Sequence, residues 1–442
     1  MLITHATLIR WLPRPAIEPD AGICIRDGLI AEIGPTAELV TRYPAEVRLD
    51  AQGLWLLPGL ICAHTHLYGA FARGIPPEGP PPADFPAILR GLWWRLDRAL
   101  TPEDCRYSAL VALCDCIRHG VTTIFDHHAS PSAARGSLDV LAEAVTEAGL
   151  RASLSYEVSD RDGLAAAAEG IAENVRFLES PSVRTPTLRG LFGLHASLTL
   201  SEATVRQAVE AASSLGVGFH VHVAEGEADV AATLARDGLR PVERWMRLGV
   251  LSPRTIAAHC VHVEPAEIEL LKETGTRVVH NPRSNMNNAV GAAPTAEMLH
   301  CGIPLGLGND GFGQDLWHEL ELAFLLPRHT ALDPRASDAS AYVDLLLRHN
   351  PATASAAFGL PVGAVQVGAA ADLILVRYEP PTPVTPGNLA WHLISGLGAA
   401  TVDTTIVNGR VLMRRGELQT LDEGAIAARA RELAAALWQR LP

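Results

Sequence analysis

Lysine is almost absent from this 442-residue chain. Lys272 is the only one, so arginine supplies nearly all of the 36 basic side chains. The 49 acidic residues give a formal net charge of −13. A strongly acidic chain lacks the positive surface with which proteins bind nucleic acid or anionic membranes. We therefore expect a small-molecule substrate, with no nucleic-acid partner and no membrane partner.

Long apolar runs and paired cysteines are also missing. No run of about 18 apolar residues, the length that crosses a bilayer as a helix, occurs in the sequence. The first residues, MLITHATLIRWLPRP, lack the basic start and apolar core of a secretory signal. The seven cysteines are scattered and form no CxxC pair, which favours free thiols and excludes a nucleotide deaminase of the PCxxC type. We expect a cytoplasmic protein.

What is present is a long α/β pattern. Hydrophobic residues make up 48% of the chain and charged residues 19%, as in globular proteins. Short apolar runs alternate with helical stretches, the pattern of βα units around a parallel sheet. Eight such units predict a (β/α)8 TIM-like barrel over residues 58–362. The expected strands are Trp55–Cys62, Val121–Phe125, Arg151–Tyr156, Gly190–Leu194, Gly218–Val223, Thr255–Ala258, Arg277–Val279 and Pro304–Leu307.

The two ends of the chain show a different pattern, of short strands joined by tight turns. Asp27-Gly28 near the start and Asn408-Gly409 near the end are strong hairpin signals. Residues 1–57 alone are too few for a stable core. We therefore predict that residues 1–57 and 363–420 form one small β-sandwich domain, and that residues 421–442 form a helix on the outside of the barrel.

The stretch PGLICAHTHLYGAFARG, residues 58–74, contains two histidines one residue apart. Alternate residues of a strand share a face, so the imidazoles of His64 and His66 can reach one point in space. An isolated HxH pair is common, and most pairs bind no metal. Further ligands at the ends of other strands would make the pair a metal site.

Such ligands are present. In (β/α)8 enzymes the carboxyl ends of the strands converge on the active site. A mononuclear hydrolytic site needs about four protein donors and an open position for water. His222 and Asp310, which follow the fifth and eighth expected strands, complete that set with His64 and His66.

Three residues at these ends are candidates for catalysis. Glu225 lies three residues past His222 and is the candidate proton shuttle between the attacking water and the leaving group. His259 is placed to stabilise the addition intermediate, and Asp310 to take the first proton as well as to bind metal. Candidate substrate contacts are His195, Arg73, Asp84, Trp94, His280 and Arg283.

The expected number of metal ions follows from the absence of a lysine at the end of the fourth expected strand. Many binuclear barrel hydrolases bridge two ions with a carbamylated lysine on the fourth strand, but here that strand ends in His195. Lys272 lies in an expected helix and cannot take that role. A bridging Glu or Cys stays open, yet one divalent ion is the better prediction; histidine and carboxylate suit zinc, our first expectation, and also iron.

The sequence resembles the amidohydrolase superfamily, in its cytosine-deaminase-like branch, and in particular the SsnA group of aminohydrolases. The resemblance spans nearly the whole chain, through LWWRLDRAL, DHHASP, HVAE, AHCVH, HNPRSNMNN and LGNDG. It assigns His64, His66, His222 and Asp310 to the metal and Glu225 to proton transfer. It also implies a homodimer or a higher homo-oligomer.

The resemblance implies hydrolytic deamination of an N-heterocycle that is purine-, pyrimidine-, pterin- or triazine-like, by attack of metal-bound hydroxide. Related nucleoside deaminases carry an HAPYT-like motif where this chain has HASLT at His195, and a substrate carboxylate for which Asp84 is a weak substitute. A chlorohydrolase or cyclic amide hydrolase is the alternative. A non-catalytic scaffold is a remote third reading, because no ligand of the site is missing.

Overall fold

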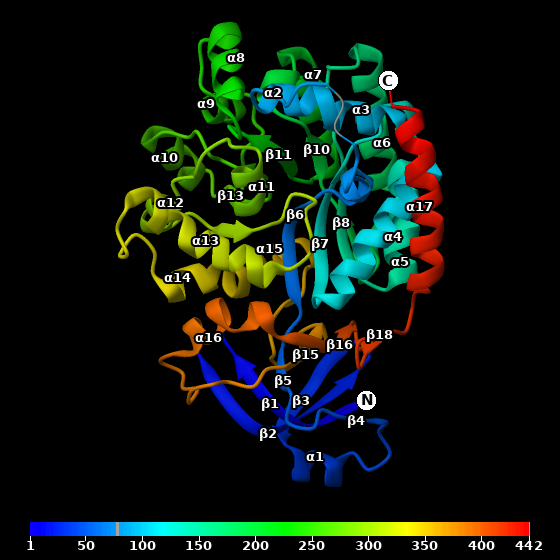
Figure 1. The fold of residues 1–442 in the computed structure, drawn as a ribbon, viewed down its shortest axis with the longest axis vertical. Coiled ribbons are helices and arrows are strands. Elements are labelled where there is room, and N and C mark those ends of the chain that lie inside the picture. The colour runs from blue at the N-terminus through cyan, green and yellow to red at the C-terminus, as the bar shows by residue number, and fades with distance from the viewer. Residues whose placement is uncertain (77–78, 442) are drawn as a thin grey trace.

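The structure is a computed structural model that describes residues 1–76 and 79–441. It is a mixed α/β fold with three sheets, two of them parallel. Figure 1 shows strands from both ends of the chain gathered at one end of the molecule, with the parallel strands and their helices at the other. Among the described residues, no helix combines the length and apolarity required to cross a membrane.

The largest sheet has nine strands and combines the two ends of the chain. Strand β5 is its junction, because it pairs in parallel with β1 and antiparallel with β15. One face of the sheet covers a cluster of buried side chains that includes Ile3, Leu8, Leu375 and Ile406. The strands are β1 (Leu2–Arg10), β2 (Ala16–Arg26), β3 (Leu29–Pro35), β4 (Arg48–Asp50), β5 (Trp55–Pro58), β15 (Leu373–Arg377), β16 (Thr401–Val407), β17 (Arg410–Arg414) and β18 (Glu417–Leu418).

Two predicted hairpins join these strands and also meet each other. Asp27 and Gly28 connect β2 to β3 with φ of 52° and 77°, and Asn408 and Gly409 connect β16 to β17 with φ of 49° and 76°. Positive φ at both central residues is the geometry of a type I′ turn. A Cβ on Gly28 would lie 2.4 Å from Oδ1 of Asn408, so the two turns pack directly together.

The first expected strand, Trp55–Cys62, is wrong as a single element, because the chain changes sheets at Gly59. Strand β5 ends at Pro58, and β6 (Leu60–Thr65) starts a parallel sheet. The Gly59 N–H donates to the Asp372 carbonyl at 2.9 Å, in the large sheet, whereas the Leu60 N–H donates to the Gly120 carbonyl at 2.9 Å. A side chain at Gly59 would lie 2.3 Å from Thr122, so only glycine fits this crossing.

The two parallel sheets follow the predicted strands closely. The fourth expected strand is interrupted at Leu191, which separates the sheets into four and five strands. Their edges meet, since Val158 bridges Leu194 in parallel and the Asn309 N–H donates to the His64 carbonyl at 3.0 Å. The strands are β6, β7 (Val121–His128), β8 (Arg151–Tyr156), β9 (Leu188–Gly190), then β10 (Phe192–Leu194), β11 (Phe219–Val223), β12 (Ile256–His259), β13 (Arg277–His280) and β14 (Leu305–Leu307).

Helices separate the parallel strands and cover their outer faces (Figure 1). The buried side chains between strands and helices form the largest hydrophobic cluster of the protein. The helices that follow the strands are α4 (Pro102–Arg118), α5 (Ser137–Ala148), α6 (Leu164–Glu179), α7 (Glu202–Leu215), α8 (Glu227–Asp237), α9 (Pro241–Arg247), α10 (Pro265–Glu273), α11 (Pro282–Asn287), α12 (Thr295–Cys301), α13 (Leu316–Ala331), α14 (Ala339–Asp344) and α15 (Asn350–Phe358). Helices α1 (Thr36–Arg42) and α16 (Leu389–Ser395) lie at the nine-stranded sheet and its border.

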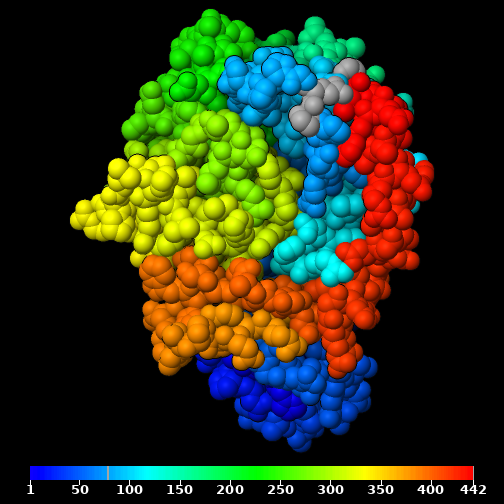
Figure 2. Space-filling view, in the orientation of Figure 1, coloured from blue at the N-terminus to red at the C-terminus, as the bar shows by residue number. Residues whose placement is uncertain are grey.

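Two further segments frame the carboxyl ends of the parallel strands. Helix α17 (Glu423–Gln439), drawn in red, runs along one side of the molecule (Figure 2) and packs Leu433 and Leu437 against Phe71 and Leu96. The second segment follows a proline-rich loop that begins at Arg73 and consists of helix α2 (Phe85–Ile88), a π-helical turn (Leu89–Trp93) and α3 (Trp94–Ala99). Residues 77–78 of that loop lie outside the described residues.

Candidate active site

The four predicted metal ligands lie together where β6, β11 and β14 end. One nitrogen from each of His64, His66 and His222 and one oxygen of Asp310 lie within 4.8 Å of one another. Asp310 Oδ1 is 2.9 Å from His64 Nε2 and 3.0 Å from His66 Nε2, and the Nε2 atoms of His66 and His222 are 3.2 Å apart. Such spacings are those of donor atoms around a single ion.

The second ring nitrogens explain why these atoms face one another. His66 Nδ1 donates to the His127 carbonyl at 2.5 Å, and His222 Nδ1 donates to the His195 carbonyl at 2.9 Å. An imidazole that donates from Nδ1 presents a lone pair at Nε2, the form that binds a metal. His64 is held by a contact between its Nδ1 and His220 Nε2 at 2.8 Å.

The charges of the cluster also favour a cation. Burial lowers the pKa of His64 to about 3 and places that of His222 well below its usual range, so both rings are neutral. Burial lowers the pKa of His66 as well, but the hydrogen bond and charge of Asp310 outweigh it and raise that pKa to about 9. The Asp310 carboxylate therefore draws a positive charge to this point, and the donor set fits a divalent ion.

A second group of possible ligands overlaps the first. His127 and Glu157 lie within 4.8 Å of the same two histidines, His66 and His222. Each of those rings already uses Nδ1 to donate to a carbonyl, so each has one nitrogen left for a metal. The two groups therefore cannot each bind an ion at the same time, and this donor set fits one ion.

Glu225, His259 and Asp310 form a triangle beside the cluster. His259 Nε2 is 3.7 Å from Glu225 Oε2 and 3.7 Å from Asp310 Oδ1, and it has no hydrogen-bond partner among the described residues. His259 Nδ1 donates to Asn285 Oδ1 at 2.8 Å, which fixes the ring. Distances of 3.7 Å are too long for direct hydrogen bonds, so Nε2 of His259 stays available to a bound group.

The backbone around this triangle is strained. Ala224, His259, Cys260 and Asp310 have φ of 47°, 72°, 48° and 56°, in the left-handed region that side chains other than glycine disfavour. These four residues lie at the ends of β11 and β12 and just after β14. Strain of this kind persists where the fold holds functional groups in place, and here it aims His259 and Asp310 at the cluster.

A cavity opens over the cluster, between the strand ends and the segment that runs from α2 to α3. His66, His222, Glu225 and Asp310 form its floor. His195 and Trp94, two of the predicted substrate contacts, line it with their ring centroids 6.3 Å apart. The remaining wall is largely aromatic and apolar, which suits a flat heterocycle. Its members are Tyr68, Phe85, Leu89 and Trp93.

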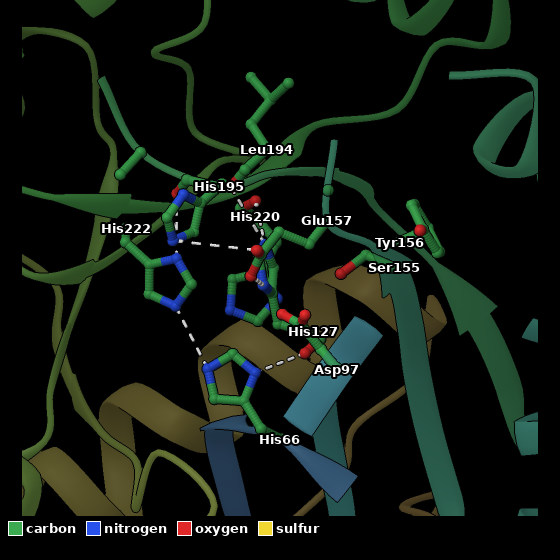
Figure 3. Close-up of polar contacts among 12 residues, drawn as sticks. His66, Asp97, His127, Ser155, Tyr156, Glu157, Leu194, His195, His220 and His222 are labelled. Atoms are coloured by element: carbon green, nitrogen blue, oxygen red, sulfur yellow. Dashed lines mark hydrogen bonds and ion pairs between the residues drawn. The ribbon is translucent and has the colours of Figure 1, made fainter. Parts of the chain in front are cut away.

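Two carboxylates of this cavity were missed in the sequence. Glu157 directly follows β8 and lies 3.3 Å from His127 Nδ1 and 3.8 Å from His195 Nε2 (Figure 3). Asp97, on α3, pairs with Arg161 at 2.5 Å and is 1% exposed. The rule that polar residues end the strands would have identified Glu157, because the third expected strand stops one residue before it. For Asp97 the sequence carried no comparable signal.

Four predicted substrate contacts do not line the cavity. Arg73 and Asp84 are exposed, and Asp84 caps α2 by accepting from the Ala87 N–H at 2.8 Å. Arg283 Nε lies 2.9 Å from the buried carboxylate of Glu319, which holds this guanidinium away from the cavity. His280 ends β13 but is 1% exposed and enclosed below the site.

The contacts that support the catalytic carboxylates continue to α11 and the residue after it. Ser284 Oγ donates to Asp310 Oδ2 at 2.5 Å, and Asn288 Nδ2 donates to Glu225 Oε1 at 3.3 Å. Burial raises the pKa of Glu225 to about 7. A carboxyl group with a pKa near neutrality can both take up and release a proton at neutral pH. This short segment therefore orients both carboxylates.

Comparison with known proteins agrees with this geometry. A model described as the amidohydrolase family matches residues 55–412, and one of an imidazolonepropionase-like composite domain of bacteria matches residues 21–45. A 5'-deoxyadenosine deaminase of Methanosarcina mazei is 32% identical over 96% of each chain. A 5-methylthioadenosine/S-adenosylhomocysteine deaminase of Moorella thermoacetica is 34% identical over 92% of each chain.

Solved structures give the same picture. A zinc-bound adenosine deaminase of Xanthomonas campestris has a TM-score of 0.86 and 26% identity, and covers 99% of this chain and 98% of its own. The atrazine chlorohydrolase TrzN of Arthrobacter aurescens shares the fold at a TM-score of 0.83 with 23% identity, over 98% of this chain and 99% of its own. The fold is thus common to proteins that release different leaving groups.

Proposed function

The chain belongs to the amidohydrolase family, and on that premise we propose that it deaminates an adenosine-type purine. The protein is a metal-dependent aminohydrolase that acts on carbon–nitrogen bonds of a small molecule and uses one divalent metal ion, for which the donor set and the zinc-bound neighbour favour zinc. The named relatives act on adenosine analogues, and the aromatic wall over the metal cluster suits a purine ring. The resemblance to the SsnA group is consistent with the same chemistry.

The observation that carries the proposal is the triangle of Glu225, His259 and Asp310 beside the four donors. The four donors would hold a divalent ion, which would lower the pKa of a bound water toward neutrality and so supply a nucleophile. Glu225 takes one proton of the attacking water and passes it to a ring nitrogen, and it then carries the proton left on the added oxygen to the amine, which departs as ammonia. His259, fixed by Asn285, donates from Nε2 to the oxygen that adds to the ring carbon.

The walls of the cavity position the heterocycle for that attack. Trp93 and Trp94 face the metal cluster from the α2–α3 segment and hold a flat ring over it. Glu157 is 6% exposed and lines the cavity, and its shortest ion-pair contact, to His127 Nδ1, is 3.3 Å long. We assign it to an N–H or O–H group of the substrate, since a buried carboxylate with acceptor capacity to spare is stabilised by a further donor.

The architecture around the site supports two further proposals. Edge contacts between β8 and β10 and between β6 and β14 support closure of the two parallel sheets into one (β/α)8 barrel over residues 58–362. The nine-stranded sheet supports a separate small domain from residues 1–57 and 363–420, with residues 421–442 on the outside of the barrel. The homodimer and the cytoplasmic location stay proposals that rest on the resemblance and the composition.

Metal analysis followed by a screen for released ammonia tests the function. We expect about one zinc per chain, and ammonia from adenosine, 5'-deoxyadenosine and 5'-methylthioadenosine at higher kcat/KM than from guanine, a pterin or an aminotriazine. Release of ammonia only from free nucleobases would contradict the adenosine-type substrate. It would still agree with a deaminase. Chloride from a chlorotriazine, or a new carboxylate without ammonia, would contradict deamination itself.

A further inference from the structure

A second cavity, of about 270 Å³, lies at the opposite ends of the parallel strands. Gly218 precedes β11 by one residue, Arg254 precedes β12 by two, and Arg277 is the first residue of β13. The same three strands end at the candidate active site, at His222, His259 and His280. The second cavity therefore opens on the amino-terminal side of the parallel strands, separated from the metal cluster by the length of the strands.

Three arginines line this cavity, and each uses its guanidinium to donate to neutral oxygens. Arg189 donates to the carbonyls of Leu188 at 2.7 Å and Phe358 at 3.2 Å. Arg254 donates to the Gly216 carbonyl at 2.9 Å. Arg277 donates to the Pro253 carbonyl at 3.1 Å and to Thr353 Oγ1 at 3.3 Å. These contacts hold the guanidinium groups without neutralising them.

No carboxylate compensates this charge within the described part of the chain. None of the three arginines forms an ion pair with an aspartate or glutamate there, although the protein carries an excess of acidic residues. Burial lowers the pKa of Arg277, and burial together with the charges of Arg151 and Arg184 lowers that of Arg189. Burial disfavours the charged form of a guanidinium, and no carboxylate is among the causes that act on either pKa.

Another cavity of the protein shows the ordinary arrangement. It lies at the nine-stranded sheet and is lined by Arg377, Arg414 and Arg415, but also by Asp50 and Asp403. Arg377 pairs with Asp403 at 3.4 Å. We call this the balanced cavity because Asp50 and Asp403 line it together with the arginines, whereas no carboxylate lines the cavity at the amino-terminal strand ends.

Much of the remaining lining of the cavity is apolar. Phe125, Leu191 and Ile256 line it together with the alanines of α15. Arginine matches phosphate and carboxylate oxygens with paired N–H donors. We propose that this cavity binds a small organic anion, a phosphate or carboxylate group carried on an apolar body, at a site distinct from the catalytic one.

Isothermal titration calorimetry of the zinc-loaded protein tests the proposal. The probes are phenyl phosphate, benzoate and inorganic phosphate, with phenol as the uncharged control. Phenyl phosphate or benzoate should bind at least tenfold more tightly than phenol, and the better of the two identifies the oxyanion. Inorganic phosphate should bind more weakly than phenyl phosphate, because it leaves the apolar wall uncovered. At ten times its Kd the preferred anion should raise Tm by roughly 1–3 °C.

Substitutions of the cavity arginines test whether the anion binds in this cavity. Arg254 is exposed, so Arg254→Met carries little risk to folding. This variant should bind the preferred anion at least fivefold more weakly than the unmodified protein. The double variant Arg254→Met/Arg277→Met should show no measurable binding. Arg414→Met, in the balanced cavity, is the matched control and should bind as the unmodified protein does. All three should keep kcat/KM for the deaminated substrate within twofold in the absence of the anion.

Two results would overturn the proposal. One is the absence of binding by phenyl phosphate and benzoate at 10 mM. The other is an affinity in Arg254→Met that lies within threefold of the unmodified protein, which would place the anion at the catalytic metal or elsewhere. Loss of binding after zinc removal, with Arg254→Met unaffected, would assign the anion to the metal.

Discussion

The two ends of the parallel strands carry charged and polar groups that suit ligands of opposite charge. At the carboxyl ends of β6, β11 and β14, three imidazoles and a carboxylate place their donor atoms within 4.8 Å of one another, a set that fits a divalent cation. At the opposite, amino-terminal side of the parallel sheets, Arg189 in β9, Arg254 before β12 and Arg277 in β13 line one cavity that has no carboxylate in its lining. Most polar groups of a folded protein are paired within the chain. Unbalanced groups at both ends of one set of strands therefore indicate two ligands of opposite charge.

The difference between the ends lies in how rigidly the side chains are held. The donors of the metal cluster are fixed by second contacts, such as His222 to the His195 carbonyl at 2.9 Å, and are almost fully buried. Arg254, by contrast, is exposed and makes one contact to a backbone oxygen. Fixed donors suit catalysis, where geometry has to be kept, and exposed arginines suit reversible binding of an anion.

The largest effect should come from exchanging carboxylates at the catalytic end. Glu225→Gln should lower kcat by about 10³-fold, because an amide cannot carry the proton, whereas the zinc content stays near one per chain. Glu157→Gln is the matched control, a second buried glutamate of the same cavity. It should raise KM by about tenfold and change kcat little, since it loses one charged hydrogen bond to the substrate. Steady-state kinetics and metal analysis check both variants.

Full activity of Glu225→Gln would contradict the proton-shuttle role and with it the proposed mechanism. Equal losses of kcat in the two variants would contradict the separation of proton transfer from substrate binding. Either result would contradict the assignment of Glu225 to catalysis and of Glu157 to substrate binding.

Two glycines, one at each end of the parallel strands, allow the packing at the two ends to be compared. A Cβ on Gly308 would lie 2.7 Å from the His64 carbonyl and 3.0 Å from His64 Cβ, so Gly308→Ala should move this ligand and weaken zinc binding by roughly 10–100-fold. A Cβ on Gly218 would lie 2.1 Å from the Arg254 carbonyl. Gly218→Ala should lower the free energy of unfolding by about 1–3 kcal/mol and leave zinc affinity unchanged.

Competition with a zinc chelator and denaturant unfolding separate the two effects. The comparison fails if Gly218→Ala loses zinc as readily as Gly308→Ala, because the two ends would then not be independent. Each variant serves as the control of the other, since both add a single methyl group next to a strand.

The smallest effect concerns the pH profile. Asn288 donates to Glu225 at 3.3 Å, and a hydrogen bond to the ionised form of a carboxyl group lowers its pKa. Burial already raises the pKa of Glu225 to about 7, so Asn288→Ala should raise it further, by roughly half a unit. Activity that needs ionised Glu225 is lost as pH falls, so the acidic limb of kcat/KM should move to higher pH.

Profiles of kcat/KM from pH 5 to 9 measure this shift. Asn287→Ala changes a neighbouring asparagine whose amide contacts Asn288 rather than Glu225, and it should leave the limb in place. An acidic limb that stays put in Asn288→Ala, or that moves to lower pH, would contradict the assignment of the limb to Glu225.

Local patterns along the chain were enough to predict most elements and the positions on them of the four candidate metal ligands. Strand ends are local features, and an HxH pair that follows an apolar run must present both rings on one face. His64, His66, His222 and Asp310 could therefore be assigned from residue types and spacing alone. The hairpins at Asp27-Gly28 and Asn408-Gly409 were equally local, because few residue pairs accept positive φ twice in succession.

Features that depend on distant neighbours could not be predicted in this way. Arg283 pairs with Glu319, 36 residues further on, and is thereby removed from the substrate cavity. The change of sheet at Gly59 depends on Asp372 and Gly120, which lie beside it only in the folded protein. The arginine cavity likewise collects residues from separate loops and strands, each ordinary in its own segment. Local sequence fixes backbone direction and side-chain alternation, whereas packing determines which side chains meet and which charges they pair with.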